Sequence, residues 1–503
     1  AQTVALYETL RADPLGWPTA LAHTTPLKPP VVAWIGEFFV PLGMALGSVD
    51  AGLLLSIWMT HVVVLMVVYR ALLALSGKRT LAATAGTLLT GASPLFIGLS
   101  SQYLAEASQT LAVAWFVWIM AGARQWGRPK LAAHLVAATS FAMLAKTTSP
   151  AFCAIPAMIA IAQSIRRRAP SVESQEREAS WPWWVLAALL ALMAGAWYAV
   201  NSEAVLHHAR TAAFGPVAEL YGRRDSFGSG FIEWCAMAWA VFFLRPVALL
   251  LAALAILGVA RRFLARTSAS AEWHDLAAGA ALLQVFLTLA IFALSPVREP
   301  RYLVALLPLV AVVVCWAIVQ DGDWAARVVI GALVIQLALT HTQVLGLWPT
   351  RPPVLRADVG MSPILHGVHL DSGPADGLAA IVRRTCAPGS AAVHNFVGVD
   401  LLHLSGHALT YAAAKERLAG RAGDCRYDSI AFGSVEAAEA EVKARPYLYW
   451  ITVDPQIHPV PAYHAFLNQS APVVFRRLRG GGVLEPEPWD GPTGVLLYRF
   501  VKR

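Results

Sequence analysis

The segment Thr24-Thr-Pro-Leu-Lys-Pro-Pro-Val-Val-Ala-Trp34 stands just ahead of the first long apolar run of the chain. Around it, residues 1–50 mix Glu8, Asp13 and Lys28 with prolines and aromatic residues, a composition that does not cross a membrane. We interpret this stretch as a folded loop with interfacial helices that lies against the membrane. The rest of the chain is then expected to hold a membrane-embedded cavity against this loop.

Hydrophobic residues make up 57% of the 503-residue chain and charged residues only 14%, with a mean hydropathy of +0.55. These values lie outside the range of soluble globular domains, so the sequence predicts a polytopic membrane protein. The net charge of +8 does not indicate nucleic-acid binding, because the Lys and Arg residues cluster in short loops between apolar runs.

Apolar runs of about 20 residues, the length that crosses a bilayer, recur along residues 51–346. We expect a short helical hairpin over 131–165 and a break at Arg245-Pro246 that divides 231–260 into an interfacial helix and a short span. In all, about ten spans are predicted. The simple runs lie near 51–75, 81–99, 104–122, 182–200, 276–294, 301–319 and 325–345.

The basic residues between these runs fall on alternate loops, and hence on one face of the membrane. The positive-inside rule makes that face cytoplasmic. The first loop and everything after about residue 347 are then extracytoplasmic, in an integral protein of a bacterial inner membrane. We also expect residues ahead of Ala1, including a further span. The residues that set this orientation are Lys78, Arg79, Arg124, Arg128, Lys130, Arg166, Arg167, Arg168, Arg261, Arg262 and Arg266.

Hydropathy drops after Trp348, and prolines lead into a tail that covers residues 347–503. Helical patterns at 377–384 and 435–445 alternate with β-rich apolar patterns, so the tail is expected to be an extracytoplasmic α/β domain. The predicted strands are 391–397, 447–453, 473–478 and 495–501.

Two of the five cysteines, Cys386 and Cys425, lie in this tail. An isolated pair there suits a disulfide if the tail faces an oxidising compartment. Cys153, Cys235 and Cys315 lie in apolar runs and are expected to be small core residues. No cysteine or histidine spacing predicts a metal site.

Ionisable residues at membrane depth are costly, so each one needs a partner or a function. Glu106 stands at the outer mouth of the run 104–122. Its carboxylate could orient a sugar hydroxyl, activate an acceptor or bind a divalent ion, or it could be only a helix-terminal acid that the macrodipole favours. Lys146 lies at the outer tip of the hairpin, where either an anionic ligand or snorkelling would explain a lysine.

Arg298, Arg301 and Tyr302 stand together at the outer start of a span. Arg can hold a phosphate through two hydrogen bonds, although Glu299 could simply pair with one of the two arginines. Such a rim of cations and acids around an apolar bundle favours a lipid-linked phosphate whose tail lies in the membrane.

Four short motifs follow one another in the order Lys28-Pro29-Pro30, Tyr-Leu-Ala-Glu106, Leu-Ala-Lys146 and Pro-Arg301-Tyr302-Leu. In this order and topology, residues 1–345 resemble the polyprenyl-phosphate-sugar-dependent glycosyltransferases of the GT-C superfamily. The pattern looks like the bacterial family that is related to protein O-mannosyltransferases and aminoarabinose transferases of the cell envelope.

The resemblance implies transfer of one sugar, a hexose or a pentose, from a polyprenyl-phosphate donor to a lipid, glycan or protein acceptor on the outer face. It also implies a catalytic acid on the first outer loop, which we expect immediately ahead of Ala1. Within the chain the alternatives are Glu8, Asp13 and Glu106. No cofactor is expected; some relatives use a divalent cation, but no acid cluster indicates one here.

The cations would stabilise the negative charge that grows on the leaving phosphate. The predicted phosphate-binding residues are Lys146, Arg245, Arg298, Arg301 and Tyr302, and the predicted substrate-loop residues are Lys28, Arg223 and Arg224.

Two other classes of function stay open. A lipid or small-solute transporter would bury polar residues at mid-span and break its helices there, whereas most of these runs have apolar centres. A non-catalytic cell-envelope scaffold would bind a partner through the tail.

Overall fold

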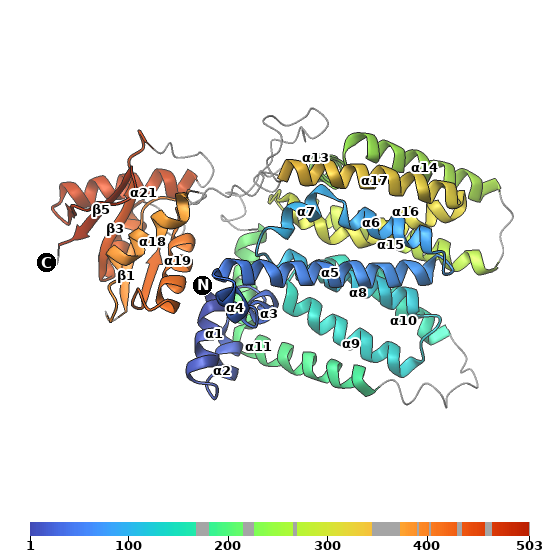
Figure 1. Ribbon diagram of the computed structural model, residues 1–503, viewed down its shortest axis with the longest axis horizontal. Coiled ribbons are helices and arrows are strands. Elements are labelled where there is room, and N and C mark those ends of the chain that lie inside the picture. The colour runs from blue at the N-terminus through green and yellow to red at the C-terminus, as the bar shows by residue number, and fades with distance from the viewer. Residues whose placement is uncertain are drawn as a thin grey trace. The chain divides into compact units, whose positions relative to one another are not determined.

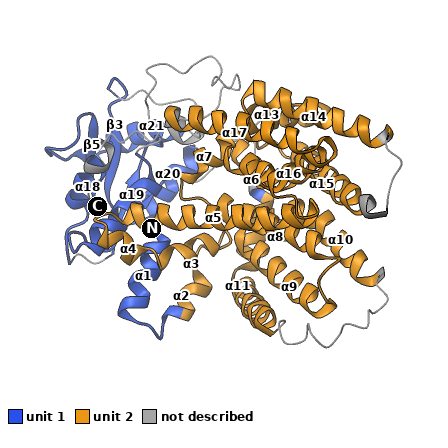
Figure 2. Cartoon of the chain, turned by 45° about the vertical axis from the view of Figure 1, so that its right-hand side comes forward, with its two compact units in different colours: residues 1–17, 211–223, 370–503 blue, residues 18–210, 224–369 orange. Residues whose placement is uncertain are grey.

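The computed structural model describes residues 1–166, 181–214, 226–264, 269–344, 373–389, 392–401, 404–429, 435–457 and 465–501. The chain forms two compact units (Figure 2). Unit 1 contains Ala1–Trp17, Thr211–Arg223 and Leu370–Arg503, and unit 2 contains Pro18–Arg210 and Arg224–His369. The first 17 residues therefore cluster with the C-terminal domain, although the sequence suggested one loop over residues 1–50.

Unit 2 is a helical bundle (Figure 1). Three short helices, α2 (Trp17–His23), α3 (Val31–Glu37) and α4 (Val40–Ala45), lead into the long α5 (Val49–Leu75). The other helices are α6 (Thr80–Gly91), α7 (Pro94–Ser100), α8 (Glu106–Gly122), α9 (Arg128–Ala145), α10 (Pro150–Arg166), α11 (Trp181–Phe214), α13 (Phe227–Phe242), α14 (Arg245–Leu264), α15 (Ala269–Ala293), the 3-10 helix η1 (Pro300–Leu306), α16 (Leu307–Asp321) and α17 (Asp323–Val344).

In the described part of the chain, five segments are long and apolar enough to cross a membrane on their own: α5, α11, α15, η1 with α16, and α17. Two further pairs reach that length only as bent spans: α6 with α7, at 58°, and α13 with α14, at 109°. The shorter helices α8, α9 and α10 occupy the remaining apolar runs, and the predicted hairpin is α9 followed by α10.

Arginines gather at the end of the bundle where α16 stops. Arg79 donates a hydrogen bond of 3.1 Å to the Val319 carbonyl, and Arg261 lies 3.2 Å from the Asp321 carboxylate. Because η1 and α16 form one apolar segment from Pro300 to Asp321, this arginine-rich end lies opposite Arg301. The fold thus places Arg79 and Arg261 at one end of the bundle and Arg301 at the other.

Unit 1 contains a five-stranded sheet in the order β2-β1-β3-β5-β4. The strands β2 (Cys425–Asp428), β1 (Val393–Val397) and β3 (Tyr447–Val453) run parallel, whereas β5 (Val495–Phe500) is antiparallel to β3 and to β4 (Leu484–Pro486). Helices α18 (Gly373–Thr385) and α19 (Gly406–Leu418) pack on one face. Helices α20 (Val435–Ala444) and α21 (Ala465–Gly480) pack on the other.

Both faces of the sheet are buried because its strand residues alternate between two cores. Ile451 and Val453 point into the core under α18 and α19, and Trp450 points into the core under α20 and α21. The remaining helix of unit 1, α1 (Gln2–Ala12), contacts α19, and Glu8 forms an ion pair with Arg417 there.

The predicted strand at 473–478 is wrong, because these residues belong to helix α21. Its buried residues Ala471, Val474 and Leu478 follow the helical period and pack under the sheet. Pro472 lies inside this helix, where the sequence suggested the boundary of a strand.

Cys386, just after α18, and Cys425, at the start of β2, form a disulfide with their Cα atoms 6.0 Å apart. Cys153, Cys235 and Cys315 are free thiols.

We expect purified, unreduced protein to react with three equivalents of a maleimide after denaturation, and with five once it has been reduced. Intact mass measures the adducts. Five adducts before reduction would show that the pair is not bonded in the native protein.

Candidate functional site

A buried carboxylate joins three segments of unit 2. Glu106 is the first residue of α8 and is 4% exposed. Its Oε1 lies 2.9 Å from the Lys146 ammonium and 3.5 Å from Nε of Arg301. A carboxylate that is so deeply buried needs paired charge, and these two cations supply it. Residues far apart in the chain therefore meet at one ion-pair cluster, which we call the Glu106 cluster: Glu106, Lys146, Arg301 and Tyr302.

The aromatic ring of Tyr302 forms one side of this cluster. The Lys146 ammonium lies 4.0 Å from the ring centroid and the Arg301 guanidinium carbon 5.6 Å from it, so both cations contact the π face. Glu299 lies 3.4 Å from Arg301. The side chains of Lys146 and Arg301 are 18% and 32% exposed, so the bundle does not cover either side chain completely.

The loop that precedes Glu106 is fixed at both ends. Tyr103 donates a hydrogen bond of 2.5 Å to the Val32 carbonyl in α3, and Trp58 of α5 donates one of 2.8 Å to the Ser100 carbonyl. These bonds hold the last turn of α7 and the start of α8 against α3 and α5. The position of Glu106 therefore depends on the segment 24–34.

Helix α11 holds the other end of that segment. Trp197 donates a hydrogen bond of 2.9 Å to the Thr24 carbonyl, and Asn201 donates one of 2.6 Å to the Ala22 carbonyl. Lys28 lies between α2 and α3 and is exposed, and it is near enough for its charge to act on Lys146. The predicted substrate-loop lysine and the predicted phosphate-binding lysine thus face a common region.

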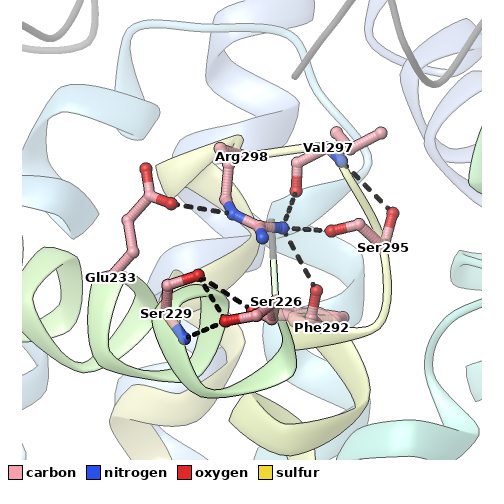
Figure 3. Close-up of polar contacts among 7 residues, drawn as sticks. All are labelled: Ser226, Ser229, Glu233, Phe292, Ser295, Val297 and Arg298. Atoms are coloured by element: carbon pink, nitrogen blue, oxygen red, sulfur yellow. Dashed lines mark hydrogen bonds and ion pairs between the residues drawn. The ribbon is translucent and has the colours of Figure 1, made fainter. Parts of the chain in front are cut away.

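Arg298 has a different environment from Arg301 (Figure 3). Its Nη1 donates to the backbone carbonyls of Ser295 and Phe292, the latter at 3.4 Å, and its Nε donates to Glu233 of α13 at 3.1 Å. The side chain is only 10% exposed. Because its donors are directed at protein acceptors, Arg298 holds the loop after α15 against α13.

The other predicted site residues lie outside the Glu106 cluster. Arg245 is exposed at the first residue of α14. Glu8 is paired with Arg417 in unit 1, and the Asp13 carboxylate accepts a hydrogen bond of 3.0 Å from the Gly16 amide in a local turn. Arg223 and Arg224 lie outside the described residues.

Sequence reasoning missed the buried amides of Gln109, Gln284 and Gln336 in unit 2. Gln109 lies one turn after Glu106 and donates a hydrogen bond of 3.0 Å to Thr148, in the loop that carries Lys146. Gln284 of α15 and Gln336 of α17 bond to backbone groups where other helices begin or break. A polar residue inside an apolar run is the signal that could have identified them.

The Glu106 cluster has the chemistry of an anion site. One buried carboxylate pairs with two partly exposed cations, and both cations contact the ring of Tyr302. A guanidinium and an ammonium together can hold a phosphate group, the first through paired hydrogen bonds and the second as a point charge.

Replacing Glu106 by Leu is expected to lower the midpoint of thermal unfolding in detergent, since removing the acid leaves two partly buried cations near each other without the carboxylate that they share. The expected cost is about 3 kcal/mol. Glu299→Leu is the matched control, because that carboxylate is 32% exposed and should matter little. An unfolding midpoint for Glu106→Leu equal to that of the wild type would contradict the structural role of this ion pair.

Arg298→Lys is expected to loosen the loop 294–299, because an ammonium cannot reproduce a guanidinium fork directed at several acceptors. Hydrogen–deuterium exchange of this loop should rise in Arg298→Lys and change less in Glu233→Gln, which keeps an acceptor for Nε. Equal exchange in Arg298→Lys and the wild type would show that the Arg298 guanidinium is not needed to hold the loop.

Comparison with known proteins was made through both sequence and structure. No protein-family model matches the chain, and no curated protein matches it in sequence. Among solved structures, it is similar to ArnT from Cupriavidus metallidurans bound to undecaprenyl phosphate, with a TM-score of 0.50 and 14% identity over 99% of this chain and 92% of that chain. The apo state of the same protein gives a TM-score of 0.51, also at 14% identity, with the same coverage. The chain therefore shares its fold with this protein, which confirms the predicted fold of a helical membrane domain followed by a C-terminal α/β domain.

Proposed function

We propose that this protein is a membrane glycosyltransferase that takes a sugar from a polyprenyl-phosphate donor. The observation that carries the proposal is the Glu106 cluster, in which Lys146, Arg301 and Tyr302 meet at one end of the bundle. The solved structure of the same fold that binds undecaprenyl phosphate supports this choice of ligand.

The Glu106 cluster would act on the phosphate of the donor. When an acceptor hydroxyl attacks the anomeric carbon, the bond from that carbon to the phosphate oxygen breaks and negative charge grows on the phosphate. Arg301 and Lys146 are already charged and oriented, so they would stabilise this charge with little reorganisation. The polyprenyl tail would remain in the membrane beside the apolar helices.

Glu106 itself suits a positioning role better than the role of a base. Its carboxylate is almost fully buried and contacts two cations, so proton uptake would leave Lys146 without this acid partner and Arg301 with Glu299 alone. We therefore assign to Glu106 the task of holding Lys146 and Arg301. Glu8 and Asp13 have local partners in unit 1 and carry no assignment.

The acceptor hydroxyl would belong to a lipid, a glycan or a protein on the extracytoplasmic side. Two features support this sidedness. The arginines at the opposite end of the bundle suit a cytoplasmic face, and the disulfide in unit 1 suits an oxidising compartment. The protein would reside in the inner membrane of a bacterium.

A lipid transporter is the second candidate, and one observation favours it. Two spans are bent, at 58° and 109°, and buried Gln336 bonds the breaks of both, at Ala92 and Leu244. Discontinuous helices with polar contacts at the break occur in transporters. A transporter would move a polyprenyl-phosphate sugar without releasing its sugar to an acceptor, and a transfer assay separates the two activities.

Arg301→Ala and Lys146→Met are each expected to lower kcat/KM for a polyprenyl-phosphate sugar by about 10- to 100-fold, the effect of losing one charged hydrogen bond to the leaving phosphate in the transition state. Transfer of radiolabelled sugar in membranes measures this effect. Arg261→Ala is the matched control, because Arg261 pairs with Asp321 at the opposite end of the bundle.

Unchanged KM and kcat in both variants would remove the Glu106 cluster from the reaction. Movement of the labelled donor across vesicles, with no transfer to any acceptor, would favour the transporter.

A further inference from the structure

Helix α15 provides a buried amide that lies against the start of α10, next to the loop that carries Lys146. Gln284 is 0% exposed. Its Oε1 accepts a hydrogen bond of 2.8 Å from the Ile155 amide, and its Nε2 donates one of 2.7 Å to the Ala151 carbonyl. These two backbone groups pair with each other in an uninterrupted α-helix, so Gln284 contacts both groups of one helical hydrogen bond.

The same stretch of α10 lacks one of its helical hydrogen bonds. Pro156 lies inside the helix and has no amide hydrogen to donate to the Phe152 carbonyl. Thr288, one turn after Gln284, places its hydroxyl 2.7 Å from the Ala151 carbonyl. Two side chains of α15 therefore bond the same helical turn in which Pro156 leaves the Phe152 carbonyl without its usual donor.

This turn is directly connected to Lys146. Helix α9 ends at Ala145 and α10 begins at Pro150, so only four residues separate them. Within that loop the Ser149 amide donates to the Lys146 carbonyl at 3.0 Å, and the Phe152 amide donates to the Ser149 carbonyl at 3.0 Å. Such a short and internally bonded loop transmits the position of α10 to the Lys146 backbone.

Helix α15 also reaches the second cation. Near its end, the Phe292 ring lies 5.4 Å from the Phe152 ring and 6.1 Å from the Tyr302 ring. Arg298 binds the Phe292 carbonyl as well. One helix thus contacts the structures that carry Lys146 and Arg301.

We propose that Gln284 is a positioning residue for anion binding, which sets the place of Lys146 in the Glu106 cluster by bonding the first turns of α10. The inference rests on the proposed function only in taking a polyprenyl phosphate as the anion. Gln284 touches no ligand and acts through Lys146.

The test is a double-mutant cycle between Gln284 and Lys146, read out as the Kd of undecaprenyl phosphate for the full chain in nanodiscs. We expect Gln284→Leu and Lys146→Met each to weaken binding by about 10-fold, and the double variant to weaken it by about 10- to 20-fold instead of the 100-fold product. A side chain that only stabilises the bundle would give the full product, because its effect would be independent of Lys146.

Gln336→Leu is the matched control. Gln336 is equally buried and also bonds two backbone groups, the Leu244 amide and the Ala92 carbonyl, each at 2.8 Å. Its combination with Lys146→Met should give the product of the single effects. If Gln284→Leu does not fold, Thr288→Val removes one donor to the same carbonyl; its single effect should be smaller, about threefold, and should largely disappear in the Lys146→Met background.

Hydrogen–deuterium exchange of the peptide that spans residues 147–156 is the second readout. It should rise in Gln284→Leu and stay unchanged in Gln336→Leu. Independent effects of Gln284 and Lys146 on Kd, or unchanged exchange in this peptide, would overturn the inference.

Failure of the proposed function gives a different result. If the wild type binds undecaprenyl phosphate without transferring a sugar, the enzyme proposal falls while the coupling between Gln284 and Lys146 still stands. If the wild type does not bind it, both proposals fall.

Discussion

The buried Glu106 carboxylate is the constraint on which the functional end of this bundle depends. A charge at this depth is stable only if cations reach it, and here Lys146 comes from the α9–α10 hairpin and Arg301 from η1. Three separate pieces of chain must therefore meet at one place. The cluster that results is a structural joint of the bundle, and because its cations are only partly covered we propose it as the anion site as well.

Backbone irregularities around this joint explain how the cations are held. The loop before η1 is held by Arg298, which binds several carbonyls, and the start of α10 is held by Gln284. Arg298 binds carbonyls of a loop, and Gln284 adds hydrogen bonds to a helical turn that Pro156 interrupts. Helices that end or bend inside the bundle allow charged residues to be placed at its rim. Buried polar side chains supply hydrogen-bond partners to the backbone groups at those breaks, which an apolar environment does not supply.

Most of the fold could be predicted from hydropathy, because long apolar runs and basic loops are strong signals. The hairpin tip at Lys146 and the break ahead of Arg245 were also visible, since prolines and charges mark them.

The site was predicted only as separate candidates: Glu106, Lys146 and Arg301 each drew attention as costly charges, but sequence alone does not show that they touch. Arg298 could not be distinguished from Arg301, because the carbonyls that it binds belong to the conformation of one short loop. Gln284 was missed because one amide barely changes the hydropathy of a 25-residue helix. The α21 error has a similar origin, since a short apolar group beside a proline resembles a strand until its helical period is followed through Leu478.

The most direct test of this account is an experimental structure of the protein with undecaprenyl phosphate bound. The account predicts that the phosphate lies within hydrogen-bond distance of both Lys146 and Arg301, with Glu106 still paired beneath them. A phosphate bound elsewhere on the bundle, with the Glu106 cluster closed and free of ligand, would contradict it.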